Sequence, residues 1–213
     1  IQRFWKPFMR GVFLENDLST TVRKFEETFR LFAQGETTLP RRGIGEIPIQ
    51  MAEQLPIEQL KLGHSVTDVH AREIKTKDGK SWQGRAVVVA TDFEVTNQFL
   101  GVDVSKFEWN AVDCLYFSLP EKDLPLEMPI LHLDGSGEGP INNLTFVSAL
   151  CECVPDGKAL ASASLIGRED LAIDELVESA RKQLVSWFGD LSKTWKNIHN
   201  YRIKRAVPSC LGS

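Results

Sequence analysis

The sequence predicts an α+β protein, in which an antiparallel or mixed sheet is flanked by helices. Apolar residues recur at three- and four-residue steps in residues 19–35 and 168–189, which is the period of an amphipathic helix. After residue 110, short segments of alternating polarity follow one another between turn residues, which is typical of antiparallel strands. Residues 86–90 are a continuous aliphatic run, which is typical of a strand buried on both faces.

The first half of the chain predicts two helices before any strand. One helix starts near Ser19, which is a good N-cap, and ends at Gly35. Its apolar stripe is expected to lie in the core and consists of Val22, Phe25, Phe29 and Phe32. A second helix spans residues 47–55, with Pro48 in its first turn, where a missing N–H is tolerated.

The next segment changes from a helical to an alternating pattern. Residues 66–74 predict one strand, Lys77–Lys80 a tight turn and Trp82 the returning strand, so a hairpin is expected. The aliphatic run at 86–90 would then be a central strand, and residues 93–100 a short helix.

The second half predicts an antiparallel sheet and one long helix. The strand candidates are residues 111–119, 130–133, 144–150, 160–166 and 197–208. The helix at 168–189 carries acidic residues near its positive N-terminal end and is ended by Gly189.

Composition excludes several classes of partner. The 25 basic and 29 acidic residues give a net charge of −4, and no basic run is interleaved with aromatic residues, so nucleic acid is not expected as a partner. The longest aliphatic run is far shorter than the roughly 18 apolar residues of a membrane span. We expect a protein of the cytoplasm or of an organelle's soluble phase, not a secreted one, and a peripheral membrane contact stays open.

The cysteines do not predict a metal site. Cys151 and Cys153 would share one face if their segment were a strand, where such neighbours do not easily bridge, so reduced buried thiols are expected. None of the four histidines has a second ligand at a standard zinc spacing.

Two segments carry a resemblance to a known family. Residues 39–48 (LPRRGIGEIP) precede a helical segment, and residues 86–91 (AVVVAT) follow the hairpin. In this order they resemble the middle of FAD-dependent oxidoreductases, in the superfamily of flavin amine oxidases, protoporphyrinogen oxidases and phytoene desaturases. Those enzymes begin with a Gly-x-Gly-x-x-Gly turn that holds the FAD pyrophosphate, and no such turn opens a helix in this sequence. We therefore expect an incomplete part of such an enzyme, inactive alone and retaining FAD weakly or not at all.

The resemblance implies seven cofactor-binding positions. Glycine at the first loop permits close approach to a flat ligand, although the same loop would suit a tight turn before a helix. For the aromatic residue beside the flavin, Trp195 is an alternative to Tyr201. The seven are Arg42, Gly43 and Ile44 near the flavin ring, Val66, Ala90 and Thr91 at the adenine, and Tyr201 beside the flavin.

The resemblance also implies a domain division. It assigns residues 1–40 and 93–197 to a substrate-binding domain, residues 41–92 to part of an FAD-binding α/β domain, and residues 198–213 to the return toward that domain. Its reaction would be the dehydrogenation of an apolar or ring-containing small molecule by hydride transfer to flavin.

Two other functions remain open at this point. One is a non-catalytic binding module with the substrate-domain fold, and the other is an amine or polyamine oxidase. Amine oxidases of the family often place a lysine beside the flavin from the first strand of the substrate sheet, and residues 109–119 contain none, which favours dehydrogenation. No Ser, His and Asp arrangement and no carboxylate pair identifies a catalytic residue.

Overall fold

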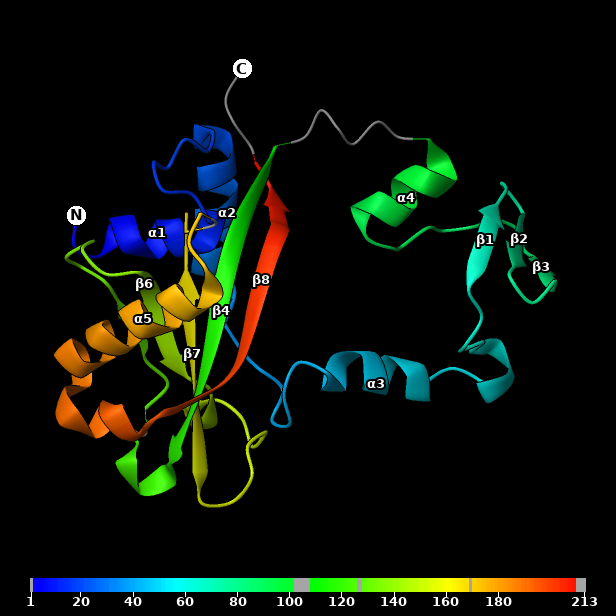
Figure 1. Ribbon diagram of the computed structural model, residues 1–213. Coiled ribbons are helices and arrows are strands. Elements are labelled where there is room, and N and C mark those ends of the chain that lie inside the picture. Colours follow the sequence, from blue (N-terminus) through cyan, green and yellow to red (C-terminus); the bar gives the residue numbers. More distant parts are fainter. Residues whose placement is uncertain (1, 102–107, 126–127, 169, 210–213) are drawn as a thin grey trace. The chain divides into compact units, whose positions relative to one another are not determined.

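The computed structural model describes residues 2–101, 108–125, 128–168 and 170–209. The chain divides into two compact units (Figure 1), with unit 1 formed by Ile1–Glu46 and Trp109–Ser213 and unit 2 by Ile47–Glu108. Every strand pair in the described residues is antiparallel. The predicted α+β class is therefore confirmed.

Unit 1 is built on a five-stranded sheet with the order β5-β6-β7-β4-β8. Its longest strands run side by side, as the green and red arrows of Figure 1 show. The predicted strands are all present, except that Val147–Ala149 forms a 3-10 turn, η3, where the sequence predicted the end of a strand. The strands are β4 (Trp109–Pro120), β5 (Leu131–Leu133), β6 (Ile141–Phe146), β7 (Lys158–Leu165) and β8 (Lys196–Pro208).

The core of unit 1 lies between this sheet and helix α5 (Ile173–Phe188), which crosses one face of the sheet in Figure 1. Large residues on β4 pair with small ones on β7, as Phe117 does with Ala161 and Leu115 with Ala163. The small alanines allow the helix to approach the sheet closely. The helix ends before Gly189, as predicted, because that residue has φ +70°, a conformation that favours glycine.

The N-terminal helices pack on each other through aromatic rings. Helix α1 spans Trp5–Phe13 and α2 spans Val22–Gln34, with the Thr21 side chain accepting a hydrogen bond from the Lys24 N–H at 3.3 Å. The prediction that the apolar stripe of α2 lies in the core is wrong, because the side chains of its four residues are 39–71% exposed. The stripe consists of Val22, Phe25, Phe29 and Phe32. Only α1 contacts the stripe through rings in the described residues, as Trp5 does with Phe29 at 5.7 Å and Phe8 with Phe32 at 5.6 Å.

Over its described residues, unit 2 contains a three-stranded meander and two helices. The expected strand over residues 66–74 is broken, since the His70 N–H donates to the Glu73 carbonyl at 2.8 Å and closes a turn. The third strand returns after the predicted turn. The elements are α3 (Glu46–Glu53), the 3-10 turn η1 (Ile57–Gln59), β1 (Val66–Val69), β2 (Glu73–Thr76), β3 (Ser81–Gln83) and α4 (Phe93–Leu100).

The aliphatic run at residues 86–90 does not form the central strand that the sequence predicts. The segment is irregular, and Val88 is 86% exposed. A buried strand needs neighbours that supply hydrogen bonds and cover both faces, and the described sheet of unit 2 consists of β1, β2 and β3 alone.

The boundaries of the two units also differ from the expected domain boundaries. Residues 41–46 belong to unit 1, and α4 belongs to unit 2. Residues 198–208 lie within β8 and extend the sheet of unit 1. The assignment of substrate binding to one unit and FAD binding to the other stays a prediction.

The sheet of unit 1 carries one titratable group whose environment predicts a pH effect. His132 contacts Phe146 and Phe188, with ring centroids 5.6 and 5.3 Å apart, and its buried Nδ1 has no hydrogen-bond partner in the part of the chain that the structure describes. Burial lowers the pKa of His132 from its ordinary value of 6.5. The folded state therefore disfavours the charged ring, and the unfolded state binds the proton first as the pH falls.

We expect the free energy of unfolding to decrease as the pH falls through the unfolded pKa of about 6.5 toward the lowered folded value. The substitution His132→Phe should flatten this decrease between about pH 7.5 and about pH 5.5, because it removes the titrating group. Urea unfolding at both pH values measures the effect. Leu131→Ala, at an exposed and non-titrating position on the same strand, is the control and should keep the wild-type dependence.

Candidate functional site

The second face of the five-stranded sheet presents rings and neutral polar groups in place of an apolar core. Pairing across the strands fixes its members: Cys114 lies opposite Ser164 and Tyr201, and Tyr116 lies opposite Ser162 and His199. On the next strand Thr145 pairs with Ser162. We call these positions the open face. They are Cys114, Tyr116, Thr145, Ser162, Ser164, His199 and Tyr201. None of these seven is charged, and the nearest charged group on the same face is Lys196, which pairs with Ser118 one step further along β4.

Three rings group at one edge of the open face. Tyr201 meets Tyr116 edge to face at 5.9 Å and His199 at 4.3 Å, and it is 51% exposed. Because side chains on β8 alternate, His199 and Tyr201 point to the same side of the sheet. The cluster therefore offers a partly exposed aromatic surface for a flat or apolar ligand.

Cys114 lies beside these rings but is not suited to nucleophilic chemistry. Burial raises the pKa of its thiol, and Asp113 raises it further, whereas a hydrogen bond with Ser164 lowers it. A thiol whose pKa lies above the ordinary value of 9.0 is neutral at pH 7, and the thiolate is the nucleophile. Cys114 thus contributes a small neutral surface to the open face.

The glycine loop before α3 is a tight turn in unit 1. Gly43 has φ +94°, and its N–H donates to the Pro40 carbonyl at 2.9 Å. Ile44 is 66% exposed at the tip. Arg42, which is exposed, forms an ion pair with the half-buried Glu46, with Nη2 2.7 Å from Oε2.

A loop from the sheet lies directly against this turn. The Glu152 N–H donates to the Arg41 carbonyl at 2.6 Å, and Arg41 Nη2 is 2.7 Å from Glu152 Oε1. A Cβ on Gly43 would lie 3.6 Å from the Cβ of Cys153. The contacts join positions more than 100 residues apart, so no local sequence pattern could have indicated them.

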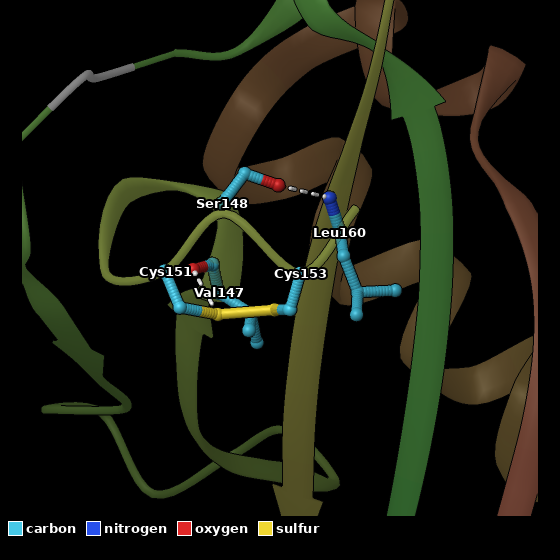
Figure 2. The surroundings of a disulfide bond; sticks show 5 residues. All are labelled: Val147, Ser148, Cys151, Cys153 and Leu160. Atoms are coloured by element: carbon cyan, nitrogen blue, oxygen red, sulfur yellow. Dashed lines mark hydrogen bonds between the residues drawn. A yellow bond between two sulfur atoms is a disulfide. The ribbon is translucent and has the colours of Figure 1, made fainter. Parts of the chain in front are cut away.

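The expected free thiols at Cys151 and Cys153 are also wrong, because the two residues form a disulfide (Figure 2). The segment that contains them is a loop after η3, and its Cα atoms at 151 and 153 are 5.4 Å apart. In a strand, residues two apart are separated by almost two full rises of about 3.3 Å, which keeps their side chains apart. The turn of the chain brings them within bonding range.

The three predicted adenine positions lie in unit 2. Val66 begins β1 and pairs with Thr76. Ala90 and Thr91 end the irregular segment before α4, and the Thr91 and Thr96 hydroxyls are 3.0 Å apart. Asp92 caps α4 by accepting from the Val95 N–H at 2.9 Å, so a carboxylate already occupies that helix N-terminus.

The predicted positions are thus divided between the units. Arg42, Gly43, Ile44 and Tyr201 belong to unit 1, and the other three belong to unit 2. Sequence reasoning missed Tyr116, His199 and Cys114 as neighbours of Tyr201. Period-two alternation would have placed Cys114 with Tyr116 on one face of a strand, but the pairing across strands was needed to find the cluster.

The chain was compared with known protein families. Residues 1–209 match the family of flavin-containing amine oxidoreductases. The chain belongs to this family. The comparison with curated proteins found no match.

Solved structures of other proteins share the fold at low identity. Reduced UDP-galactopyranose mutase is 15% identical with a TM-score of 0.60, and the match covers 98% of this chain and 53% of that one. An oxidoreductase from Methanosarcina mazei is 15% identical with a TM-score of 0.70, covering 94% and 51%. A putrescine oxidase variant is 11% identical with a TM-score of 0.55, covering 79% and 41%. The chain therefore spans about half the length of these structures, and the likeness shows the fold.

Flavin is the cofactor that membership of this family implies, and the described residues fit only part of it. Ile44 is exposed at the turn and Gly43 carries no side chain, which suits one side of a flat ring. The pyrophosphate is not matched in the same way, because no Gly-x-Gly-x-x-Gly turn opens a helix in this sequence. Within the described residues, no helix is long and apolar enough to cross a membrane.

Proposed function

We propose that the chain supplies the substrate-binding part of an FAD-dependent oxidoreductase that dehydrogenates an apolar or ring-containing small molecule. The open face carries this proposal, because Tyr116, Tyr201 and His199 form an aromatic surface beside neutral hydroxyl groups. Aromatic rings bind flat apolar groups through large contact areas, and single hydroxyls fix orientation. A cationic substrate would meet no carboxylate at these positions.

The cofactor positions follow from family membership. Arg42, Gly43, Ile44 and Tyr201 would hold the flavin ring, and the backbone at Val66, Ala90 and Thr91 would hold the adenine. When bound, FAD would supply the hydride acceptor, while the protein binds and orients the substrate and excludes water. The exposed tip at Ile44 and the partly exposed ring of Tyr201 support the first group.

Amine or polyamine oxidation is the second candidate, and the family itself favours it. Against it, β4 contains no lysine, and the open face offers no carboxylate to a protonated amine. The two candidates differ in the charge of their substrates, so substrate choice separates them.

The first experiment tests flavin binding and substrate class together. The protein encoded by the complete gene and this 213-residue chain are purified and mixed with excess FAD, and the absorption bands of oxidised flavin are recorded after removal of free cofactor. We expect bound flavin in the complete protein and weak or absent flavin in this chain. Stoichiometric flavin in this chain would contradict the partial fit, and absent flavin in both would favour a binding module.

The second step mixes the flavin-loaded complete protein without oxygen with neutral ring compounds and with primary amines. Loss of the oxidised flavin band with the neutral set supports dehydrogenation, and loss with amines alone contradicts it. In the responding set, Tyr201→Ala should slow flavin reduction at low substrate about 2- to 10-fold, because ring contacts contribute about 0.5–1.5 kcal/mol. Lys204→Ala on the same strand is the matched control and should leave the rate unchanged.

A further inference from the structure

The disulfide loop of unit 1 is attached to the sheet at one end and to the glycine turn at the other. The Leu160 N–H on β7 donates to the Ser148 hydroxyl at 2.8 Å, and the Cys151 N–H donates to the Val147 carbonyl at 3.1 Å. Figure 2 shows the disulfide beside this anchored turn. The loop therefore reaches from a rigid strand to the segment that contains Arg41 and Gly43.

Glu152 is the single residue enclosed between the two cysteines, and it makes both polar contacts to Arg41. The disulfide closes a small covalent ring around Glu152, which restricts its backbone before any contact forms. The Arg41–Glu152 ion pair is exposed, and an exposed ion pair alone contributes little. Holding Glu152 in place thus depends on the ring, because ordering a free residue has a large entropic cost.

We propose that Cys151 and Cys153 form a redox-controlled clamp that holds the turn at residues 41–43 when oxidised and releases it when reduced. A dithiol is the reductant. Its thiolate attacks the sulfur of Cys153, the S–S bond breaks, and Cys151 leaves as a thiolate that takes up a proton. The second thiol of the dithiol then attacks the mixed disulfide, releasing Cys153 as a thiol and leaving the reagent as a disulfide.

Exposure sets the order of these steps. Cys153 is exposed, whereas Cys151 is 7% exposed. Attack therefore occurs at Cys153, and limited reduction should leave the mixed disulfide on Cys153 with Cys151 as the first free thiol. The clamp acts within unit 1 and does not rest on the proposed function.

The test measures amide hydrogen exchange of this chain with and without dithiothreitol, together with thiol alkylation and mass spectrometry. Without reductant, alkylation should leave Cys151 and Cys153 unlabelled while Cys114 reacts after denaturation. With reductant, the amides of Glu152 and Gly43 should exchange about 5- to 30-fold faster, the range expected when ordering one residue is lost. Amides of α5 such as Ala180 should not change.

Two variants separate the clamp from general loosening. The double substitution Cys151→Ser and Cys153→Ser should show the fast exchange without reductant and no further response to it. Cys114→Ser should respond like the wild type. Labelling of Cys151 and Cys153 in the untreated protein, or equal exchange of Glu152 and Gly43 in both redox states, would overturn the proposal.

Discussion

Replacing Arg202 with methionine is expected to destabilise unit 1 by about 3–5 kcal/mol, because the substitution leaves a buried carboxylate without its counter-charge. Asp113 is 3% exposed, and Arg202 contacts it through Nε at 2.8 Å and Nη2 at 3.2 Å. Arg202 Nη2 also donates to the Leu171 carbonyl at 2.8 Å. The pair therefore joins β4, β8 and the segment that leads into α5, and urea unfolding followed by circular dichroism measures the loss.

The double substitution Asp113→Leu and Arg202→Met tests the stated cause. Replacing both charges with apolar groups removes the stranded carboxylate, so much of the lost stability should return. Arg23→Met is the matched surface control, since Arg23 pairs with Glu27 at 3.3 Å with both side chains exposed. Its effect should stay below about 1 kcal/mol. Similar losses in Arg202→Met and Arg23→Met would contradict the argument.

The elements that the sequence predicts correctly are those with local determinants. Helix α4 begins after Asp92, whose side chain caps it, and ends at Gly101 with φ +64°. Helix α5 ends at Gly189 for the same conformational reason. The strands of unit 1 are predicted correctly because only the sheet face under α5 is apolar. Buried and half-buried residues therefore alternate along each strand, as they do in β4.

The predictions that fail depend on contacts that a single segment does not contain. The strand expected over residues 66–74 is broken by one turn hydrogen bond at His70, and the run at 86–90 lacks described strand neighbours. In the candidate site, the resemblance names Tyr201 and the turn at Gly43, whereas the rings around Tyr201 and the loop carrying Glu152 come from distant segments.

The aromatic residues of unit 1 supply the sharpest test of this difference between pattern and packing. Phe117 is fully buried on β4, lies opposite Ala161, and has the Arg181 guanidinium 5.7 Å from its ring. Phe117→Ala should lower the free energy of unfolding by about 3–5 kcal/mol, since it removes a buried ring and leaves a cavity. Urea unfolding of the substituted chain measures this loss.

Phe25 on α2 is the matched case, because the helical period of the sequence predicts that Phe25 also lies in the core. It is 39% exposed and stacks on Phe29 at 5.9 Å. Phe25→Ala should therefore cost less than Phe117→Ala, about 1–2 kcal/mol, because a partly exposed ring loses less apolar burial and one aromatic pair adds about 0.5–1.5 kcal/mol to that burial. If the Phe25→Ala loss equals that of Phe117→Ala, the stripe on α2 is core after all and the helical pattern was the better guide. A loss for Phe25→Ala clearly below that for Phe117→Ala shows that the buried fraction of each ring decides its contribution to stability. A ring that is partly exposed to water loses less apolar burial when it is removed than a fully buried one.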